Sequence, residues 1–225
     1  MTMLISAQDN TRIARAVASA EAQSAGQIVT VITPRSDRYA DVALAWSAFI
    51  AFLALAALEA MPGFYVGLVD RALGLWASEW TARSYFGLAL SVAALKFAGT
   101  LAVLQWQKLR LWLTPAPIRH ARVHARALAA FRVGAESRTS GRTGVVLFVS
   151  LAEHRAEIIA DHAIADKVDP EVWGEAMAAL LGPLRENRLA EGMEAAIARI
   201  GAVLAETTPR MATTTNELPD GPILL

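Results

Sequence analysis

Two long apolar runs dominate the pattern of hydrophobic and polar positions along the chain. Residues 42–58 contain no charge, and residues 85–104 contain one, Lys96. Runs of 17 and 20 residues can cross a bilayer as helices, whereas soluble helices normally keep a polar face. The pattern therefore predicts a transmembrane hairpin over residues 42–104, with a buried helical hairpin of a soluble protein as the alternative.

A more polar segment joins the two runs. Within residues 65–80, Val69, Leu73, Trp76 and Trp80 recur at the spacing of one helical face, and the charged residues lie elsewhere. Amphipathic helices with Trp side chains are typical of the headgroup region of a membrane. We predict an interfacial helix here, anchored by Trp76 and Trp80; a third, partly buried helix is the alternative.

Shorter elements flank the hairpin, each bounded by capping residues, glycines or prolines. They are helices over about residues 7–24, 118–133, 169–182 and 189–206, and strands over residues 27–33, 145–150 and 155–160.

The strand at residues 27–33 cannot pair its backbone alone, and the two later strands need a further partner. We therefore predict one α/β domain, an α/β/α sandwich with a small mixed sheet, split by an inserted two-helix transmembrane hairpin. Its parts are residues 1–41 and 105–206. Residues 207–225, rich in Thr and Pro, are predicted to be a disordered tail.

Charge and composition narrow the function. The chain is 55% hydrophobic, balances 21 basic against 21 acidic residues and has no cysteine. Lack of cysteine excludes disulfides, Cys-ligated zinc and thiolate nucleophiles, and zero net charge gives no reason to expect a nucleic-acid partner. Six basic residues flank the hairpin, against two in residues 59–84. The positive-inside rule then predicts a multi-pass protein of the inner (cytoplasmic) membrane with both termini cytoplasmic.

Basic residues near the second run are candidates for membrane contact. Lys108, Arg110, Arg119 and Arg122 follow it, and we expect them to meet the headgroups of anionic lipids. Lys96 lies about 17 Å from either end of the extended run, at 1.5 Å per residue. We therefore expect its side chain either to extend to the membrane–water interface or to make a contact within a homo-oligomer formed through the hairpin.

The later part of the chain resembles a known family. The run TGVVLFVSLAEHRAEIIAD, a Trp-bearing helix and a final helix containing Gly192 resemble the TPM domain family, named for a thylakoid-lumen phosphatase and its relatives. GQIVTVIT and its flanks resemble the N-terminal part of that domain, so the resemblance covers about residues 5–42 and 118–206. It implies an α/β/α sandwich, roles in the repair or maintenance of membrane complexes and, for some members, phosphatase activity or calcium binding.

Four carboxylates near the end of the last predicted strand are the best candidates for chemistry: Glu157, Asp161, Asp166 and Asp169. Such a group can hold a divalent cation, which could activate water for phosphoester hydrolysis. In the alternative, Asp166 and Asp169 cap helices and the others are solvated. No other cofactor is expected.

Two pairs of residues offer weaker signals. His120 and His124 have the i, i+4 spacing that can chelate zinc, without a third ligand nearby in the sequence. Ser150 and His154 could form a nucleophile and base, without the glycines of a nucleophile elbow. The sequence therefore favours a membrane protein whose cytoplasmic TPM-like domain is a binding, assembly or maintenance module for a membrane protein complex, with an unidentified membrane protein partner. The alternative is a metal-assisted phosphatase acting on phosphoesters.

Overall fold

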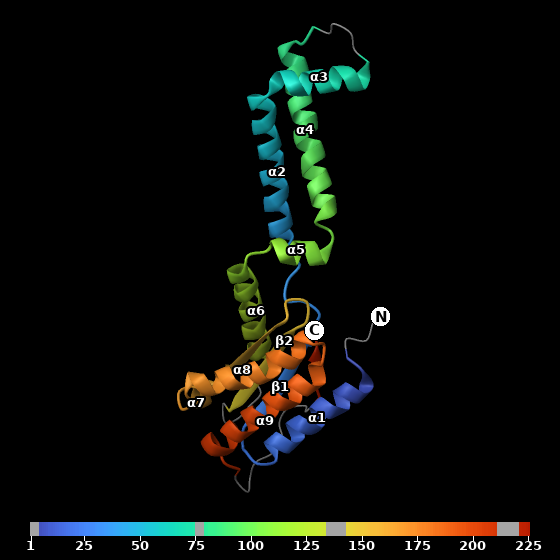
Figure 1. Ribbon diagram of the computed structural model, residues 1–225. Helices are drawn as coiled ribbons and strands as arrows, with labels where there is room; N and C mark the ends of the chain where they lie inside the picture. Colours follow the sequence, from blue (N-terminus) through green and yellow to red (C-terminus); the bar gives the residue numbers. More distant parts are fainter. Residues whose placement is uncertain (1–4, 75–78, 134–142, 211–220) are drawn as a thin grey trace. The chain divides into compact units, whose positions relative to one another are not determined.

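The computed structural model describes residues 5–74, 79–133, 143–210 and 221–225 (Figure 1). The chain divides into two compact units. Unit 1 consists of Met1–Asp37 and Ala116–Leu225, and unit 2 is Arg38–Pro115. Unit 1 is mixed α/β, and it is assembled from two stretches that flank unit 2 in the sequence.

A four-stranded sheet organises unit 1. Its strands are β1 (Gln27–Thr33), β2 (Gly144–Ser150), β3 (Arg155–Ala160) and β4 (Ile223–Leu224), in the order β3-β2-β1-β4. β1 pairs in parallel with β2 along its whole length, and β3 is antiparallel to β2. The prediction that the first strand joins the later pair is therefore confirmed. β1 and β2 are buried throughout, as their many β-branched and apolar residues favour.

The end of the chain corrects the sequence prediction. Residues 207–225 were expected to be disordered, but β4 pairs in parallel with Val31 and Ile32 of β1. Three consecutive branched apolar residues, Ile223 to Leu225, give this end a strand-forming segment that the polar composition of the tail concealed. Residues 211–220 lie outside the described part.

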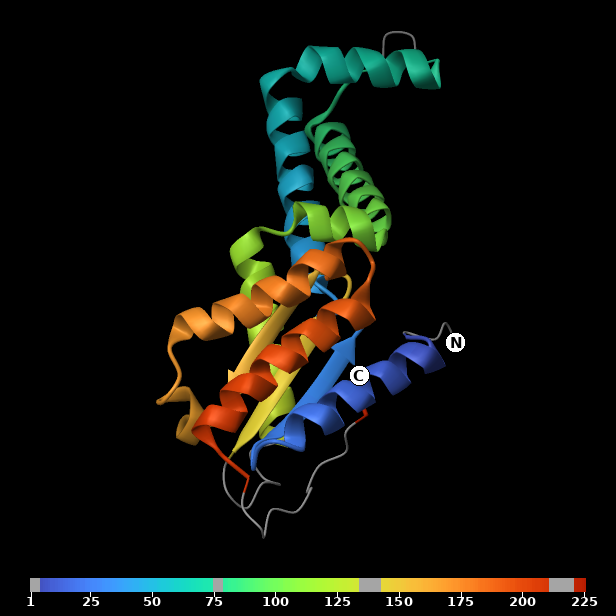
Figure 2. The same ribbon diagram turned by 60° about the horizontal axis from the view of Figure 1, so that its bottom comes forward.

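Helices cover both faces of the sheet (Figure 2). On one face, α1 (Ala7–Glu21), α8 (Pro170–Arg185) and α9 (Leu189–Thr207) enclose a core that includes Ile32, Leu147 and Ile197. On the other face, α6 (Ala116–Phe131) packs through Val123, Ala127 and Phe131 onto β1 and β2. Unit 1 therefore has its own hydrophobic core.

Two glycines allow the helices to approach closely. A Cβ built on Gly201 of α9 would lie 2.6 Å from the Cβ of Ala20 in α1, and one on Gly192 would lie 2.7 Å from the carbonyl oxygen of Leu180 in α8. Both distances are shorter than van der Waals contact. The close packing of α9 on α8 thus explains why a glycine stands at position 192, which carries part of the family resemblance.

An ion pair also joins α1 to α9. The Arg12 guanidinium donates from Nε and Nη2 to the two carboxylate oxygens of Glu194, at 2.9 and 2.6 Å. The hydrogen bond to Glu194 raises the pKa of Arg12. Both side chains are partly exposed, so the pair adds only modestly to stability.

One helix boundary and one additional helix after β3 differ from the prediction. α8 does not end at Gly182-Pro183 but continues to Arg185, with Pro183 inside its last turn. Pro removes one hydrogen bond from a helix, but the continued turn buries Leu184 in the core. A short helix that the sequence did not indicate, α7 (His162–Ala165), precedes α8.

Unit 2 is helical in its described residues. Its helices are α2 (Ala40–Ala60), α3 (Pro62–Leu73), α4 (Ala82–Val103) and α5 (Gln107–Leu113). α2 and α4 are each long and apolar enough to cross a membrane, by length and composition. α2 begins and ends two residues beyond the predicted run 42–58, and α4 begins three residues before the predicted run 85–104 and ends one residue before its end.

The polar helix of unit 2 is shorter than predicted. α3 covers Pro62–Leu73 rather than residues 65–80, because Gly74 takes a left-handed conformation, φ 66°, that ends it. The predicted end of this helix at residue 80 was thus wrong, and residues 75–78, which include Trp76, lie outside the described residues. α5 is also separate from α4, since the helix breaks in a turn after Val103.

Candidate functional site

Polar side chains gather at the carboxyl ends of β1 and β2 in unit 1. Ligands of open α/β sheets bind beyond the carboxyl ends of the strands. Here Ser36 and Asp37 follow β1, and Ser150 and Glu153 end or follow β2. The chain leaves for unit 2 directly after Asp37 and returns at Ala116, the first residue of α6. We call this region, with the α6 and β3 side chains that contact it, the polar edge.

A buried carboxylate organises the polar edge. The backbone N–H and the hydroxyl of Ser36 donate to Oε1 of Glu153, at 3.0 and 2.6 Å, and the hydroxyl of Ser150 donates to Oε2. Glu153 and Ser150 are both buried. A buried carboxylate requires such donors, so Glu153 ties the segment after β1 to the β2–β3 turn.

This arrangement replaces the Ser150–His154 pair considered from the sequence. The Ser150 hydroxyl donates to Glu153. His154 takes a left-handed conformation, φ 48°, in the turn between the strands. Glu153, three residues after Ser150, was not among the sequence candidates. The sequence signal that could have found Glu153 is an acidic residue in a tight turn after a buried strand. Acidic residues in turns are usually solvated, so this signal is weak.

Two histidines of α6 lie beside a carboxylate of β3. Nδ1 of His120 is 3.6 Å from Oε1 of Glu157, and Nδ1 of His124 is 3.5 Å from Oε2. The two imidazole rings stack with their centroids 6.5 Å apart. Nη1 of Arg155 is 3.5 Å from Nδ1 of His120. The fold thus places an acid beside the histidine pair.

The four carboxylates predicted to hold a metal lie in different settings. Glu157 lies beside the histidines, and exposed Asp166 and Asp169 follow α7 and precede α8. Asp161 is buried; its Oδ1 accepts from the backbone N–H of His162, and its Oδ2 has no hydrogen-bond partner among the described residues. In the described ranges, no group of three or more His, Asp or Glu side chains is arranged to hold a metal ion. Divalent cation binding therefore stays a prediction.

The predicted membrane-contact residues belong to both units. In unit 1, Arg119 is partly buried, and Nε of Arg122 lies 3.3 Å from Oδ2 of Asp37. In unit 2, Lys108 is exposed and Arg110 is partly buried on α5.

The Trp80 side chain lies before α4. Its Nε1 donates to Oδ1 of Asp70 at 3.3 Å, and its ring contacts that of Tyr85, with centroids 5.3 Å apart. These contacts hold the start of α4 near α3.

Lys96 is nearer one end of its helix than the sequence suggested. The second run was taken to continue to Lys108, but α4 ends at Val103. Seven residues, about 10 Å, separate Lys96 from that end, and 14 residues, about 21 Å, separate it from Ala82. The side chain is exposed, and it has no ion pair or hydrogen bond within the described ranges.

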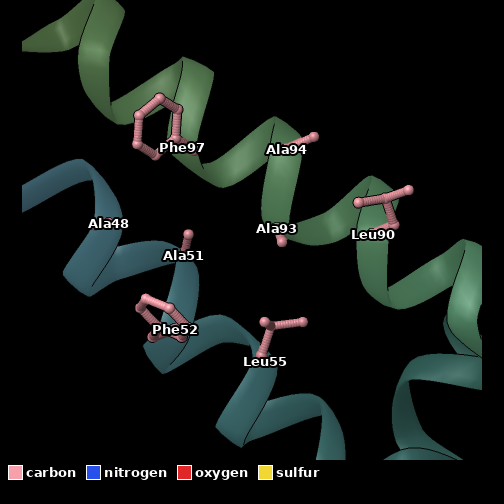
Figure 3. Close-up of a pocket in the computed structure, with 8 residues that line it drawn as sticks. All are labelled: Ala48, Ala51, Phe52, Leu55, Leu90, Ala93, Ala94 and Phe97. Carbon is pink, nitrogen blue, oxygen red and sulfur yellow. The ribbon is translucent and has the colours of Figure 1, made fainter. Parts of the chain in front are cut away.

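The surface of unit 2 is unusually apolar. Phe52, Phe86, Leu90 and Leu95 are each 70% exposed or more. Figure 3 shows the side chains that line a cavity between α2 and α4, all of them apolar. The volume of this cavity is about 450 Å³. Its lining residues are Ala48, Ala51, Phe52, Leu55, Leu90, Ala93, Ala94 and Phe97. Apolar side chains on this scale call for an apolar environment around the helices.

Comparisons with known proteins give a likeness of fold. No protein-family model matches the sequence, and no curated protein matches it. The structure is similar to the NMR structure of the BA42 protein from the psychrophilic bacterium Bizionia argentinensis. The match covers 100% of this chain and 98% of the other, with a TM-score of 0.57 and 15% sequence identity. At this identity the likeness concerns the fold alone.

Proposed function

We propose that the chain is an integral protein of the inner membrane, crossing it through α2 and α4. Its α/β unit is a cytoplasmic binding or assembly module that maintains a membrane protein complex. One observation carries this proposal: large apolar side chains cover the outside of α2 and α4, whereas unit 1 buries its own in a core. In water such a surface would aggregate, but in lipid it is stable.

The hairpin suits a bilayer in length and lining. α2 and α4 have 21 and 22 residues, about 32 Å at 1.5 Å per residue, against a hydrocarbon core of about 30 Å. Lipid chains would fill the apolar cavity between them. With both termini cytoplasmic, Lys108 and Arg110 would lie at the inner headgroups, together with Arg119 and Arg122.

Lys96 favours self-association of the hairpin. The Cα–Cβ bonds of a helix tilt toward its N-terminus, so this side chain starts out directed away from the nearer end of α4. Reaching the headgroups there requires it to fold back over about 10 Å of helix. A contact with a second copy, as in a homo-oligomer, would satisfy its charge without that reversal.

A binding role fits the chemistry of unit 1 better than catalysis does. The polar edge offers charged and hydrogen-bonding groups, but its Ser150 hydroxyl serves the buried Glu153, and its histidines contact Glu157. Such side chains can recognise a partner's polar surface. The resemblance to the TPM domain family, with its membrane-complex roles, supports the same proposal.

Topology and partner recovery test this function. Reporters fused to the C-terminus and to residues 75–78 should be active on opposite sides of the membrane, with the C-terminal one cytoplasmic. Crosslinking in native membranes, followed by purification, should return a recurrent membrane protein. An externally active C-terminal reporter would overturn the topology, and repeated recovery of the chain alone would overturn the binding role.

A metal-assisted phosphatase is the second candidate, favoured by one observation: the buried Oδ2 of Asp161 has no hydrogen-bond partner in the described part of the chain. If Asp161 and Asp166 hold a cation, the double variant Asp161→Ala with Asp166→Ala should abolish phosphoester hydrolysis by the purified chain. The variant Asp169→Ala should then weaken it too. Hydrolysis that survives in the double variant would exclude this site.

A further inference from the structure

One edge of β1 is occupied by the end of the same chain. β2 pairs with all seven residues of β1, whereas β4 pairs only with Val31 and Ile32 on the other side. Toward the start of β1, Oε1 of Glu21 accepts from the backbone N–H of Ile28, at 2.7 Å. The edge therefore accepts an added strand near its carboxyl end, which is the geometry of β-strand addition.

Residues 223–225, which we call the tail from here on, bind this edge through few contacts. The backbone N–H of Leu225 donates to the carbonyl oxygen of Ile32 at 3.1 Å. The Thr33 hydroxyl lies 3.2 Å from the Leu225 carbonyl oxygen, but its single proton is shared with the Arg35 carbonyl oxygen, at 2.9 Å. Ile223 packs on the core beneath α6. Leu224 and Leu225 nevertheless remain 47% exposed, so the tail buries only part of its apolar surface.

The tail also leaves space and charge unused. A cavity of about 230 Å³ remains between α6, β1 and the tail, lined in part by Ala130, Val133, Ile223 and Leu225. Arg126 of α6 lines the same cavity, and it has no ion pair or hydrogen bond with any residue that the structure describes. An unpaired guanidinium beside an apolar cavity fits a ligand with a bulky apolar side chain and a carboxylate.

We propose that the groove between the β1 edge and α6 binds an extended segment of a partner protein. This segment runs parallel to β1, fills the cavity with a bulky apolar side chain and pairs an acidic side chain with Arg126. Residues 223–225 occupy the same place in the free chain and are displaced when the partner binds. This inference rests on the proposed binding function and assigns it a site and a class of partner.

Two synthetic peptides and full-length variants test the site. One peptide copies residues 219–225, and the second carries Ile223→Phe and Leu225→Glu. The receptor is the full chain in detergent, either unchanged or with Ile223→Asn, which weakens docking of its own tail. The second peptide should bind the Ile223→Asn chain about tenfold more tightly than the first, the scale of one added charge-assisted contact. Both peptides should bind the unchanged chain more weakly, because its tail competes.

Arg126→Gln in the Ile223→Asn chain should remove most of the advantage of the second peptide. Arg132→Gln, a matched change of an exposed arginine outside the cavity lining, should leave it intact. Amide exchange in residues 27–33 should slow when the peptide binds, which checks that the variant is folded and that the strand is added there. Equal affinities for the two peptides, or equal effects of the two arginine changes, would overturn the proposal.

The same measurements separate the two proposals. A membrane partner recovered by crosslinking, with no peptide bound by any variant, would refute this groove and leave the proposed function standing. Peptide binding without a recoverable partner would support this groove and refute the proposed binding role in the membrane.

Discussion

The two units treat the same residue types in opposite ways. Leu147 in β2 of unit 1 is completely buried in a core shared by three helices, whereas Leu90 in α4 of unit 2 is 72% exposed. Glycines differ in the same manner. A methyl group on Gly201 would clash with Ala20, whereas one on Gly99 would meet no atom of the described residues within 4 Å, apart from its chain neighbours and the backbone of its own helix. The comparison teaches that unit 1 is stabilised by its own packing, whereas the helices of unit 2 leave many large apolar side chains exposed.

The largest difference is expected from matched leucine truncations. Leu147→Ala should destabilise unit 1 by about 2–5 kcal/mol, because it leaves a cavity in a packed core. Leu90→Ala should change the stability of unit 1 by less than about 0.5 kcal/mol. Denaturant unfolding of the full chain in detergent, followed by near-UV circular dichroism, measures both. Equal losses would mean that the two units do not differ in packing.

A smaller difference is expected for glycine substitutions. Gly201→Ala forces a methyl group against Ala20 and should cost about 1–3 kcal/mol through separation of α1 and α9. Gly99→Ala should be neutral or favourable by up to about 1 kcal/mol, since alanine is the better helix former. Thermal melting compares the pair. A large loss from Gly99→Ala would instead indicate that a second helix packs closely against α4.

Removing the buried carboxylate of the polar edge should have an effect of similar or lesser size. Glu153→Ala leaves the buried Ser150 hydroxyl without its acceptor and should cost about 1–3 kcal/mol. Glu59→Ala, at an exposed position near the end of α2, should alter stability by less than about 0.5 kcal/mol. Amide exchange should also accelerate after β1 and in the β2–β3 turn in the Glu153 variant. Unchanged exchange in both segments would show that Glu153 does not join them.

The smallest effect is expected at the surface ion pair. Arg12→Gln should destabilise the contact of α1 with α9 only slightly, and added salt should shrink the difference from the unchanged chain. Arg83→Gln, an exposed position on α4, should have no effect at either salt concentration. A salt-independent loss from Arg12→Gln would assign its effect to the packing of its aliphatic stem.

Local patterns predicted most of the regular elements. The β-branched run at residues 27–33 and the runs around Val145 and Ile158 became strands, and the pairing of the first with the second followed from the need of each backbone for a partner. Boundaries set by packing were missed. The continuation of α8 through Pro183 depends on Leu184 reaching the core, which no local signal reveals.

The candidate site was harder to predict because it is made by contacts distant in sequence. Glu157 meets His120 and His124 only because α6 lies against β3. Likewise, Ser36 and Glu153 are 117 positions apart, and their hydrogen bonds exist only once β1 and β2 are paired. The docking of residues 223–225 escaped prediction because a short apolar segment after a polar stretch has no periodicity to analyse.

The register of β1 against β2 has a consequence for the order of events during synthesis. Every residue of β1 pairs with one that lies 117 positions later in the chain. At about 5–20 residues per second, a ribosome takes roughly 6–23 s to make that stretch. For that interval β1, an uncharged strand rich in β-branched residues, emerges without its neighbour while both apolar helices are being made. The nascent chain therefore needs either prompt delivery to its destination or a chaperone over residues 27–33 until β2 leaves the ribosome.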